Sequence, residues 1–281
     1  MKHVLLAIAA HCQPEVLKYT LGTWLETYDR SYKVSICVSL STDFESVCKR
    51  ADEILRLDPP VDIIRVPKYK HKQHEMQMFR FSALHANCLR AIFSHCQDIP
   101  FTHVAVLDHD LEFKQDFIKW AMDQNADWVG NLFRDRKDLL RLAPHSIAGA
   151  NKPESWWAPK CSVWNCLLSR RLYDRIMEDS SVLMPALAFK NLVYDTMAKM
   201  FELMTCDWGM DVRIHKEADI EAVVKHLWSL SFDFGPNVEG HYEGLRKLVE
   251  DYNKRFPNGI RHLLDSLEVY NGNKGVFNVT V

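Results

Sequence analysis

Two carboxylates stand one residue apart at the end of an apolar run, in Asp108-His109-Asp110. The run before them, Thr102–Leu107, is rich in valine and is typical of a buried β-strand. Because side chains alternate along an extended backbone, Asp108 and Asp110 would lie on the same side, with His109 on the other in a structural role. Two carboxylates so placed can hold one hard divalent cation, and that cation can bind a diphosphate. The pattern therefore predicts chemistry on a nucleotide-activated substrate.

The composition is that of an ordinary globular protein. The chain has 281 residues, of which 47% are hydrophobic and 26% charged, so it can bury a full core. A net charge of -2 gives no electrostatic reason to expect nucleic acid or a membrane as a partner. The eight cysteines form no Cys-x-x-Cys pair, which argues against a structural zinc site and favours a reducing compartment.

The N-terminal stretch Val4–Ala10 is apolar but short, and His11 and Cys12 follow it where a signal peptide would have small residues. We therefore expect a first β-strand there and no signal peptide. No stretch reaches the roughly 20 apolar residues that a membrane span needs. These features predict a cytoplasmic protein, and the use of Met, Cys and His would suit a bacterial cell or a virus-infected host cell.

Strand and helix signals alternate along the first half of the chain, and the second half is less regular. This alternation predicts βαβ units, a mainly parallel sheet and one domain. The expected strands are Val4–Ala10, Lys33–Leu40, Asp62–Val66, Thr102–Leu107, Asp127–Phe133, Cys161–Leu168 and Glu221–Trp228. The expected helices are Gln13–Tyr28, Phe44–Leu57, Glu75–Cys96, Ser169–Glu178, Met184–Met204, Leu245–Phe256 and Gly259–Leu267.

Polar side chains lie at or just beyond the carboxyl ends of three of the expected strands. Ligands of an open parallel sheet bind at the carboxyl ends of its strands, so these side chains would share one edge with the ligand. They are His11 and Gln13, then Ser39, Ser41 and Asp43, and finally Asp108 and Asp110.

The order of these pieces resembles the nucleotide-sugar-binding half of GT-A fold glycosyltransferases, from about Val4 to Ile214. The segment Val163–Arg171 also resembles the acceptor-side strand and following helix of such enzymes. The resemblance implies a single Rossmann-like α/β domain, with a mainly parallel central sheet flanked by helices and a helical C-terminal tail. It is carried by a polar turn after the first strand, Ser39-x-Ser41, Asn87 in a long helix, Asp108-x-Asp110 and Gly209-x-Asp211.

This resemblance implies a metal-dependent enzyme that moves a sugar from a UDP- or GDP-sugar to a hydroxyl of a glycan or glycoconjugate. Residues 1–133 would bind the nucleotide sugar, residues 134–244 the acceptor, and residues 245–281 would form the helical tail. The nucleotide would be held by polar residues that could otherwise be ordinary turn and cap residues. These are His11, Gln13, Ser39, Ser41, Asp43, Asn87 and Asp108.

The resemblance also implies a metal site. Asp110 would bind Mn²⁺ or Mg²⁺ directly, and Asp108 would reach the ribose or the metal through water. In similar enzymes a C-terminal histidine supplies the third ligand; His241 is our choice for it, and His226 is the other candidate.

A carboxylate is suited to deprotonate the acceptor hydroxyl. Asp211 matches the position of the family's base, although the family pattern is Glu-Asp and this chain has Met210-Asp211. Asp207 lies four residues earlier and would share a helix face with it, which makes it the second candidate. Alternatively, Asp207 caps a helical turn and Asp211 pairs with Arg213 or Lys216.

Trp156 and Trp157 are adjacent in a polar stretch, so their rings could form a platform for the acceptor sugar. Alternatively, one of them fills the core beneath the loop. Two other functions compete with glycosyl transfer. A nucleotidyltransferase would need a Gly-rich, basic loop after the first strand, where this chain has His11-Cys12-Gln13-Pro14. A non-catalytic nucleotide- or sugar-binding module would bind its ligand without turnover.

Overall fold

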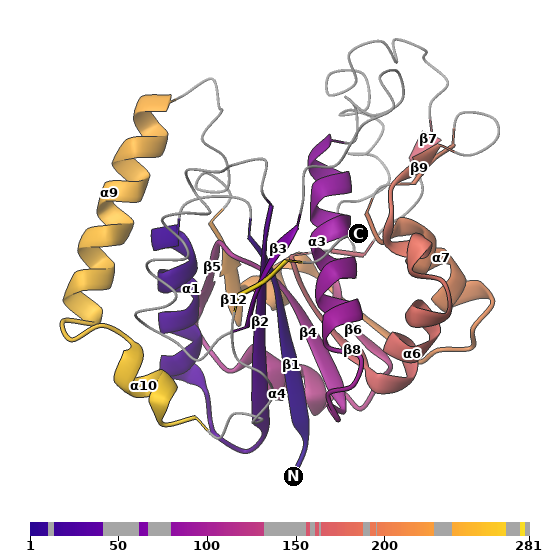
Figure 1. Ribbon diagram of the computed structural model, residues 1–281, viewed down its shortest axis with the longest axis horizontal. Helices are drawn as coiled ribbons and strands as arrows, with labels where there is room; N and C mark the ends of the chain where they lie inside the picture. The colour runs from indigo at the N-terminus through magenta and orange to yellow at the C-terminus, as the bar shows by residue number, and fades with distance from the viewer. Residues whose placement is uncertain are drawn as a thin grey trace.

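An eight-stranded central sheet organises the computed structural model (Figure 1). The structure describes residues 1–10, 14–41, 62–66, 80–131, 156–157, 161–162, 164–187, 192–194, 196–227, 238–267 and 276–278. The strand order is β11-β6-β8-β4-β1-β2-β3-β13, and every neighbouring pair is parallel except the two made by β8. The strands are β1 (His3–Ala10), β2 (Lys33–Ser41), β3 (Asp62–Val66), β4 (His103–Asp108), β6 (Trp128–Asn131), β8 (Asn165–Ser169), β11 (Val212–His215) and β13 (Val276–Asn278).

Helices cover both faces of this sheet, because its central strands are apolar on both sides. All eight residues of β1 are buried, as expected for a strand between two helical layers. Helices α1 (Pro14–Thr27), α4 (Phe117–Met122), α9 (Val238–Arg255) and α10 (Arg261–Asp265) pack on one face. Helices α3 (Arg80–His95), α6 (Arg170–Glu178) and α7 (Ala198–Cys206) pack on the other.

A small antiparallel ribbon stands beside the sheet. Its strands are β5 (Leu111–Phe113), directly after the Asp108-x-Asp110 segment, and β12 (Val224–His226). The register pairs His226 with Leu111, so the end of β12 lies next to Asp110. The remaining short elements are β7 (Trp156–Trp157), β9 (Ala186–Leu187), β10 (Leu192–Tyr194), the 3₁₀ turn η1 (Ser180–Leu183) and α8 (Glu217–Glu221).

The winding of the sheet reverses at β1. From β1 the chain continues to β2 and β3 on one side, and β4 pairs with the other side of β1. Such a reversal opens a crevice at the carboxyl ends of the two diverging strands. β4 ends there at Asp108, which pairs with Ala9 of β1.

These observations confirm the predicted α/β class with a mainly parallel sheet flanked by helices. The expected helix Met184–Met204 is wrong in its first part. Its N-terminal part contains β9 and β10, and α7 begins only at Ala198. Met197 has a φ of 62°, a left-handed conformation that an α-helix excludes. The strands β11 and β13 were not predicted, and the expected helix 44–57 lies outside the described residues.

In the part of the chain that the structure describes, no helix has both the length and the apolar character needed to cross a bilayer.

Candidate metal centre

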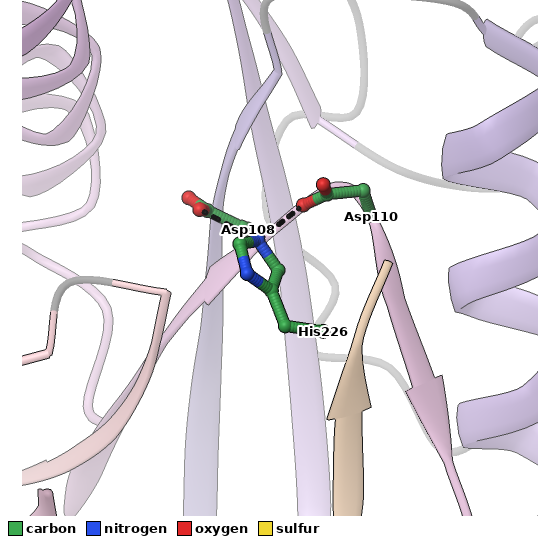
Figure 2. A group of neighbouring side chains, drawn as sticks. All are labelled: Asp108, Asp110 and His226. Carbon is green, nitrogen blue, oxygen red and sulfur yellow. Dashed lines mark hydrogen bonds and ion pairs between the residues drawn. The ribbon is translucent and has the colours of Figure 1, made fainter. Parts of the chain in front are cut away.

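Asp108, Asp110 and His226 converge at the carboxyl end of β4 (Figure 2). The Nε2 atom of His226 lies 3.0 Å from Oδ1 of Asp110 and 3.7 Å from Oδ2 of Asp108. One potential ligand atom from each residue lies within 4.8 Å of the others. The Asp110 side chain has no exposed surface, and those of His226 and Asp108 are 5% and 17% exposed. The two neighbouring carboxylates and a histidine from a distant part of the sequence therefore form one enclosed cluster.

Backbone hydrogen bonds hold each member of this cluster in position. Asp108 N–H donates to Trp164 O at 2.8 Å, and Leu227 N–H donates to Asp110 O at 2.9 Å. The second bond continues the β5–β12 pairing past His226. The indole of Trp164 stacks on the His226 ring, with centroids 4.9 Å apart and planes 10° from parallel. The His226 imidazole is thus held by stacking on its ring face as well as through the neighbouring backbone.

The chemistry of the cluster fits a divalent cation. Two carboxylates so close together repel each other, and burial reduces the screening that water would provide. A cation removes that repulsion. Carboxylate oxygens suit Mg²⁺ and Mn²⁺, and an imidazole nitrogen suits transition metals. The residues present can therefore hold such an ion.

Two further histidines adjoin the carboxylates. Nδ1 of the buried His85, from α3, lies 3.4 Å from Oδ1 of Asp108. His109 is also buried, and its Nδ1 lies 3.2 Å from Ala9 O. Burial lowers the pKa of His109, although the nearby Asp110 carboxylate opposes this shift. A neutral His109 that donates to the β1 carbonyl agrees with the structural role expected for it.

Three buried polar side chains at the same edge of the sheet each carry at least one atom without a hydrogen-bond partner among the described residues. Asn131 ends β6 and Asn165 begins β8, opposite Leu107 of β4. Ser162 joins them, since its N–H donates to Asn131 O at 2.7 Å. The unpartnered atoms are Oδ1 of Asn131, Oγ of Ser162, and Oδ1 and Nδ2 of Asn165. Sequence reasoning missed all three residues, and only the position of Asn131 and Asn165 at strand ends could have indicated them.

The structure places one of the residues predicted to bind the nucleotide level with this cluster, and a second one, Asn87, in α3. Ser39 pairs with Ala9, which in turn pairs with Asp108, so Ser39 lies level with the cluster. Its hydroxyl and the Asn87 carbonyl oxygen are buried and have no partner among the described residues. Ser41 ends β2, and its side chain lies outside the described residues, as do the whole of His11, Gln13 and Asp43.

The third ligand in the described cluster is His226. His241 lies in α9, and its side chain is outside the described residues, so its role stays a prediction. Trp156 and Trp157 form β7, which pairs in parallel with β10. Their side chains are also outside the described residues, and the acceptor platform stays a prediction.

Asp207 and Asp211 are not brought together with this cluster. Asp211 precedes β11 and lies beside Asp127 at the start of β6, because its O accepts hydrogen bonds from the N–H groups of Asp127 and Trp128. β6 runs in the same direction as β4, and the register through β8 places Asp211 level with His103. His103 starts β4 and Asp108 ends it, a separation of about 16 Å along the strand at roughly 3.3 Å per residue.

This placement corrects the expectation that both acids share a site with Asp108 and Asp110. Asp211 is 48% exposed and forms an ion pair with Arg213 at 3.1 Å, which is the alternative considered for it above. Asp207 is exposed at the end of α7, directly before the Gly209 turn that leads to β11. The error arose because β11 was not predicted, so the edge on which Asp211 falls was not known.

No protein-family model and no curated protein matches the chain. Among solved structures, it is similar to the mannosyltransferase PcManGT from Pyrobaculum calidifontis in complex with GDP-Man and Mn²⁺, with 14% identity, a TM-score of 0.43, and coverage of 94% of this chain and 68% of that one. It is also similar to mouse xyloside xylosyltransferase 1 in its apo form (13%, TM-score 0.40, 76% and 85% covered). A third is glucosyl-3-phosphoglycerate synthase from Mycobacterium tuberculosis with Mg²⁺ and uridine diphosphate (12%, TM-score 0.42, 90% and 79%). Identities and TM-scores at this level are too low to assign a function to the chain.

Proposed function

We propose that this protein is a metal-dependent glycosyltransferase that moves a sugar from a UDP- or GDP-sugar to a hydroxyl of a glycan or glycoconjugate. The observation that carries the proposal is the buried Asp108–Asp110–His226 cluster at the point where the winding of the sheet reverses. Open α/β sheets bind their ligands at this point. Burial separates this cluster from a solvated acidic turn, since two carboxylates removed from water need a compensating positive charge.

Asp110 and His226 would bind the cation directly, and Asp108 would complete the site or reach the cation through water. The mixture of carboxylate and imidazole favours Mn²⁺, with Mg²⁺ as the alternative. When bound, the cation supplies the charge that stabilises a diphosphate leaving group. His85 would orient the Asp108 carboxylate from the opposite side.

Asn131, Ser162 and Asn165 would bind the hydroxyl groups of the transferred sugar. A sugar hydroxyl both donates and accepts hydrogen bonds, and amide and hydroxyl side chains can match both roles. Buried polar atoms without a partner cost free energy, which a ligand or ordered water would recover. All three side chains are uncharged, which suits a neutral sugar better than a phosphate.

The nucleoside would bind on the other side of Asp108, near Ser39 and Asn87, whose buried oxygen atoms support this assignment. Residues 1–133 would thus bind the nucleoside and supply Asp108 and Asp110, whereas His226, Ser162 and Asn165 of the donor site come from residues 134–244, which would also bind the acceptor. We assign no catalytic base, because Asp207 and Asp211 lie at the opposite edge of the sheet.

The experiment is a thermal-shift screen of UDP, GDP, CMP and their sugars, with and without Mn²⁺ or Mg²⁺. The variants are Asp110→Asn and, as a matched control, Asp211→Asn at the other edge. A ligand at about 100 times its dissociation constant should stabilise the fold by about 2.7 kcal/mol. Turnover is followed as release of nucleoside diphosphate from the sugar donor with water as the acceptor.

We expect one nucleotide to raise the melting temperature only with metal, in the wild type and in Asp211→Asn but not in Asp110→Asn. If no nucleotide stabilises the protein with either metal, the proposal is wrong. Binding without turnover of any donor would indicate a binding module. Release of pyrophosphate when a nucleoside triphosphate and a sugar 1-phosphate are supplied together would indicate a nucleotidyltransferase.

A further inference from the structure

One hydroxyl group holds the backbone on both sides of Asp110. The side chain of Thr20, in the middle of α1, is 1% exposed. Its Oγ1 lies 2.6 Å from His109 O and 2.9 Å from Leu111 O, and it accepts a hydrogen bond from Leu111 N–H at 2.9 Å. A single side chain from another element therefore contacts the residue before and the residue after the proposed metal ligand.

This arrangement is unusual for a threonine inside a helix. A helical Thr hydroxyl commonly bonds back to a carbonyl in the preceding turn of its own helix. Thr27 does so with Thr23 O and Trp24 O, and Thr23 does so with Thr20 O. The hydroxyl contacts described for Thr20 instead all go to the segment that carries Asp110.

The backbone of Asp110 is thereby held through three successive residues. Thr20 contacts the carbonyl of His109 and both backbone groups of Leu111, and Leu227 N–H donates to Asp110 O itself. With its main chain fixed, the Asp110 carboxylate is directed to a point 3.0 Å from Nε2 of His226. A shift of this segment would move the carboxylate away from the imidazole.

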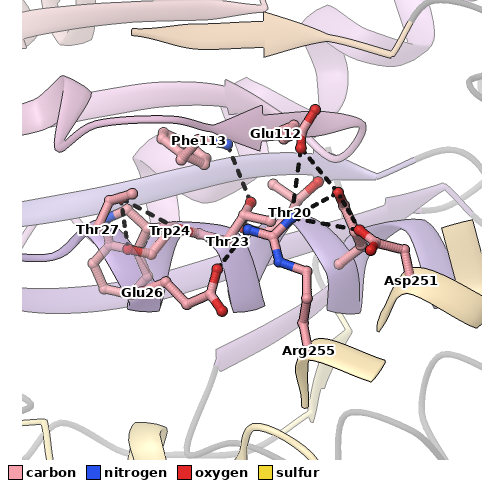
Figure 3. A network of polar contacts seen from close by, with 10 residues as sticks. Thr20, Thr23, Trp24, Glu26, Thr27, Glu112, Phe113, Asp251 and Arg255 are labelled. Carbon is pink, nitrogen blue, oxygen red and sulfur yellow. Dashed lines mark hydrogen bonds and ion pairs between the residues drawn. The ribbon is translucent and has the colours of Figure 1, made fainter. Parts of the chain in front are cut away.

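The helix that carries Thr20 is itself held by α9 (Figure 3). Arg255 contacts Glu26 at 2.5 Å and the Tyr19 hydroxyl at 2.9 Å, both on α1, and Glu112 of β5 at 3.5 Å. Tyr19 also donates to Glu112 at 3.0 Å. Besides the Thr20 contacts, the contacts of Tyr19 and Arg255 with Glu112 therefore form a second connection from α1 and α9 to β5.

We propose that Thr20 is a positioning residue that sets the location of the Asp110 carboxylate and thereby the affinity of the site for a divalent cation. This inference rests on the proposed metal site. Groups that orient metal ligands without touching the metal commonly change affinity 10–100-fold when they are removed. Thr20 differs from such groups only in acting through the backbone of the ligand.

The test compares Thr20→Val with Thr23→Val. Both substitutions keep the shape of the side chain and remove a buried hydroxyl from the same face of α1. Thr23 accepts from Phe113 N–H at 3.1 Å, three residues beyond Asp110, so Thr23→Val is the matched control. Thr20→Ser keeps the hydroxyl and serves as the rescue. Mn²⁺ affinity is measured by electron paramagnetic resonance of the free ion, and stability by thermal unfolding without metal.

We expect both valine variants to lower the melting temperature, but only Thr20→Val to weaken Mn²⁺ binding, by about tenfold or more, with Thr20→Ser near wild type. Equal loss of affinity in both valine variants, or none in Thr20→Val, overturns the inference while the metal site stands. If the wild type binds no Mn²⁺, and no nucleotide stabilises it with Mg²⁺ either, the proposed function and this inference both fail. Should Thr20→Val not fold, it is replaced by Thr20→Cys, which keeps a similar volume and a weaker hydrogen-bonding group. Thr20→Cys must then bind Mn²⁺ more weakly than Thr23→Val does.

Discussion

The two edges of the central sheet each carry a pair of aspartates, but the pairs have different surroundings. At the carboxyl edge, Asp108 and Asp110 are enclosed and meet imidazoles. At the amino edge, Asp127 bonds to Arg171 at 3.0 Å, to Ser169 Oγ at 2.7 Å and to the N–H of Asp211 at 3.0 Å. Asp211 itself faces solvent and pairs with Arg213.

This difference shows that neither the presence of two aspartates nor their spacing in the sequence is enough to identify a ligand-binding site. The amino-edge acids are neutralised by arginines and backbone donors, so they join β6, β8 and β11 together and need no ligand. The exposed Asp211–Arg213 pair contributes about 0–1 kcal/mol. Asp127 is largely buried, but its carboxylate is already paired with Arg171 and bonded to Ser169 Oγ and the Asp211 N–H. The carboxyl-edge acids are largely enclosed and converge on the His226 imidazole, which can serve beside them as a ligand to a cation.

Among the variants that test this comparison, His226→Ala should have the largest effect on Mn²⁺ binding and turnover. Loss of the only imidazole ligand in the described cluster should weaken Mn²⁺ binding by about 100-fold and lower the rate of donor turnover by a similar factor. Mn²⁺ titration and initial rates at saturating Mn²⁺ measure the two effects. His103→Gln, at the amino edge, is the control and should bind Mn²⁺ like the wild type. Equal affinity in His226→Ala and wild type would remove His226 from the site.

A smaller effect is expected from Asn165→Ala, which tests the assignment of the carboxyl-edge amides. It should lower kcat/KM for the sugar donor about tenfold, since one lost hydrogen bond to a buried polar group is worth about 1–3 kcal/mol. Mn²⁺ affinity and the binding of the free nucleoside diphosphate should not change, because neither contains the sugar. A loss of nucleotide binding equal to that of the sugar donor would contradict the assignment.

The smallest effect concerns the pH dependence of stability at the amino edge. Burial lowers the pKa of His103 to about 4, whereas an unfolded histidine titrates near 6.5. Between these values the unfolded chain binds the proton and the folded chain resists it, so the free energy of unfolding should fall as the pH falls. The free energy of unfolding, measured in urea at a series of pH values from 7 to 4.5, should fall less steeply with falling pH for His103→Gln than for wild type. An unchanged slope would mean that His103 is as accessible to protons in the folded state as in the unfolded one.

Local patterns were enough to predict much of the fold. The valine-rich run before Asp108 became β4, the apolar Val4–Ala10 became the core of β1, and Ser169 caps α6 as expected. The Asp108-x-Asp110 pair was identified as a ligand pair from its position after a strand alone. These features depend on residues close in sequence, and hydrophobic periodicity records such neighbours directly.

The sequence by itself thus determined the α/β class and the two carboxylates. Only the tertiary structure decided which histidines meet them, because His226 arrives through the pairing of β12 with β5 and His85 through the packing of α3. It also decided that Asp211 lies at the far edge, since this depends on the direction and register of β11 relative to β4. Strand pairing and helix packing join residues far apart along the chain, and one sequence read locally does not contain these contacts.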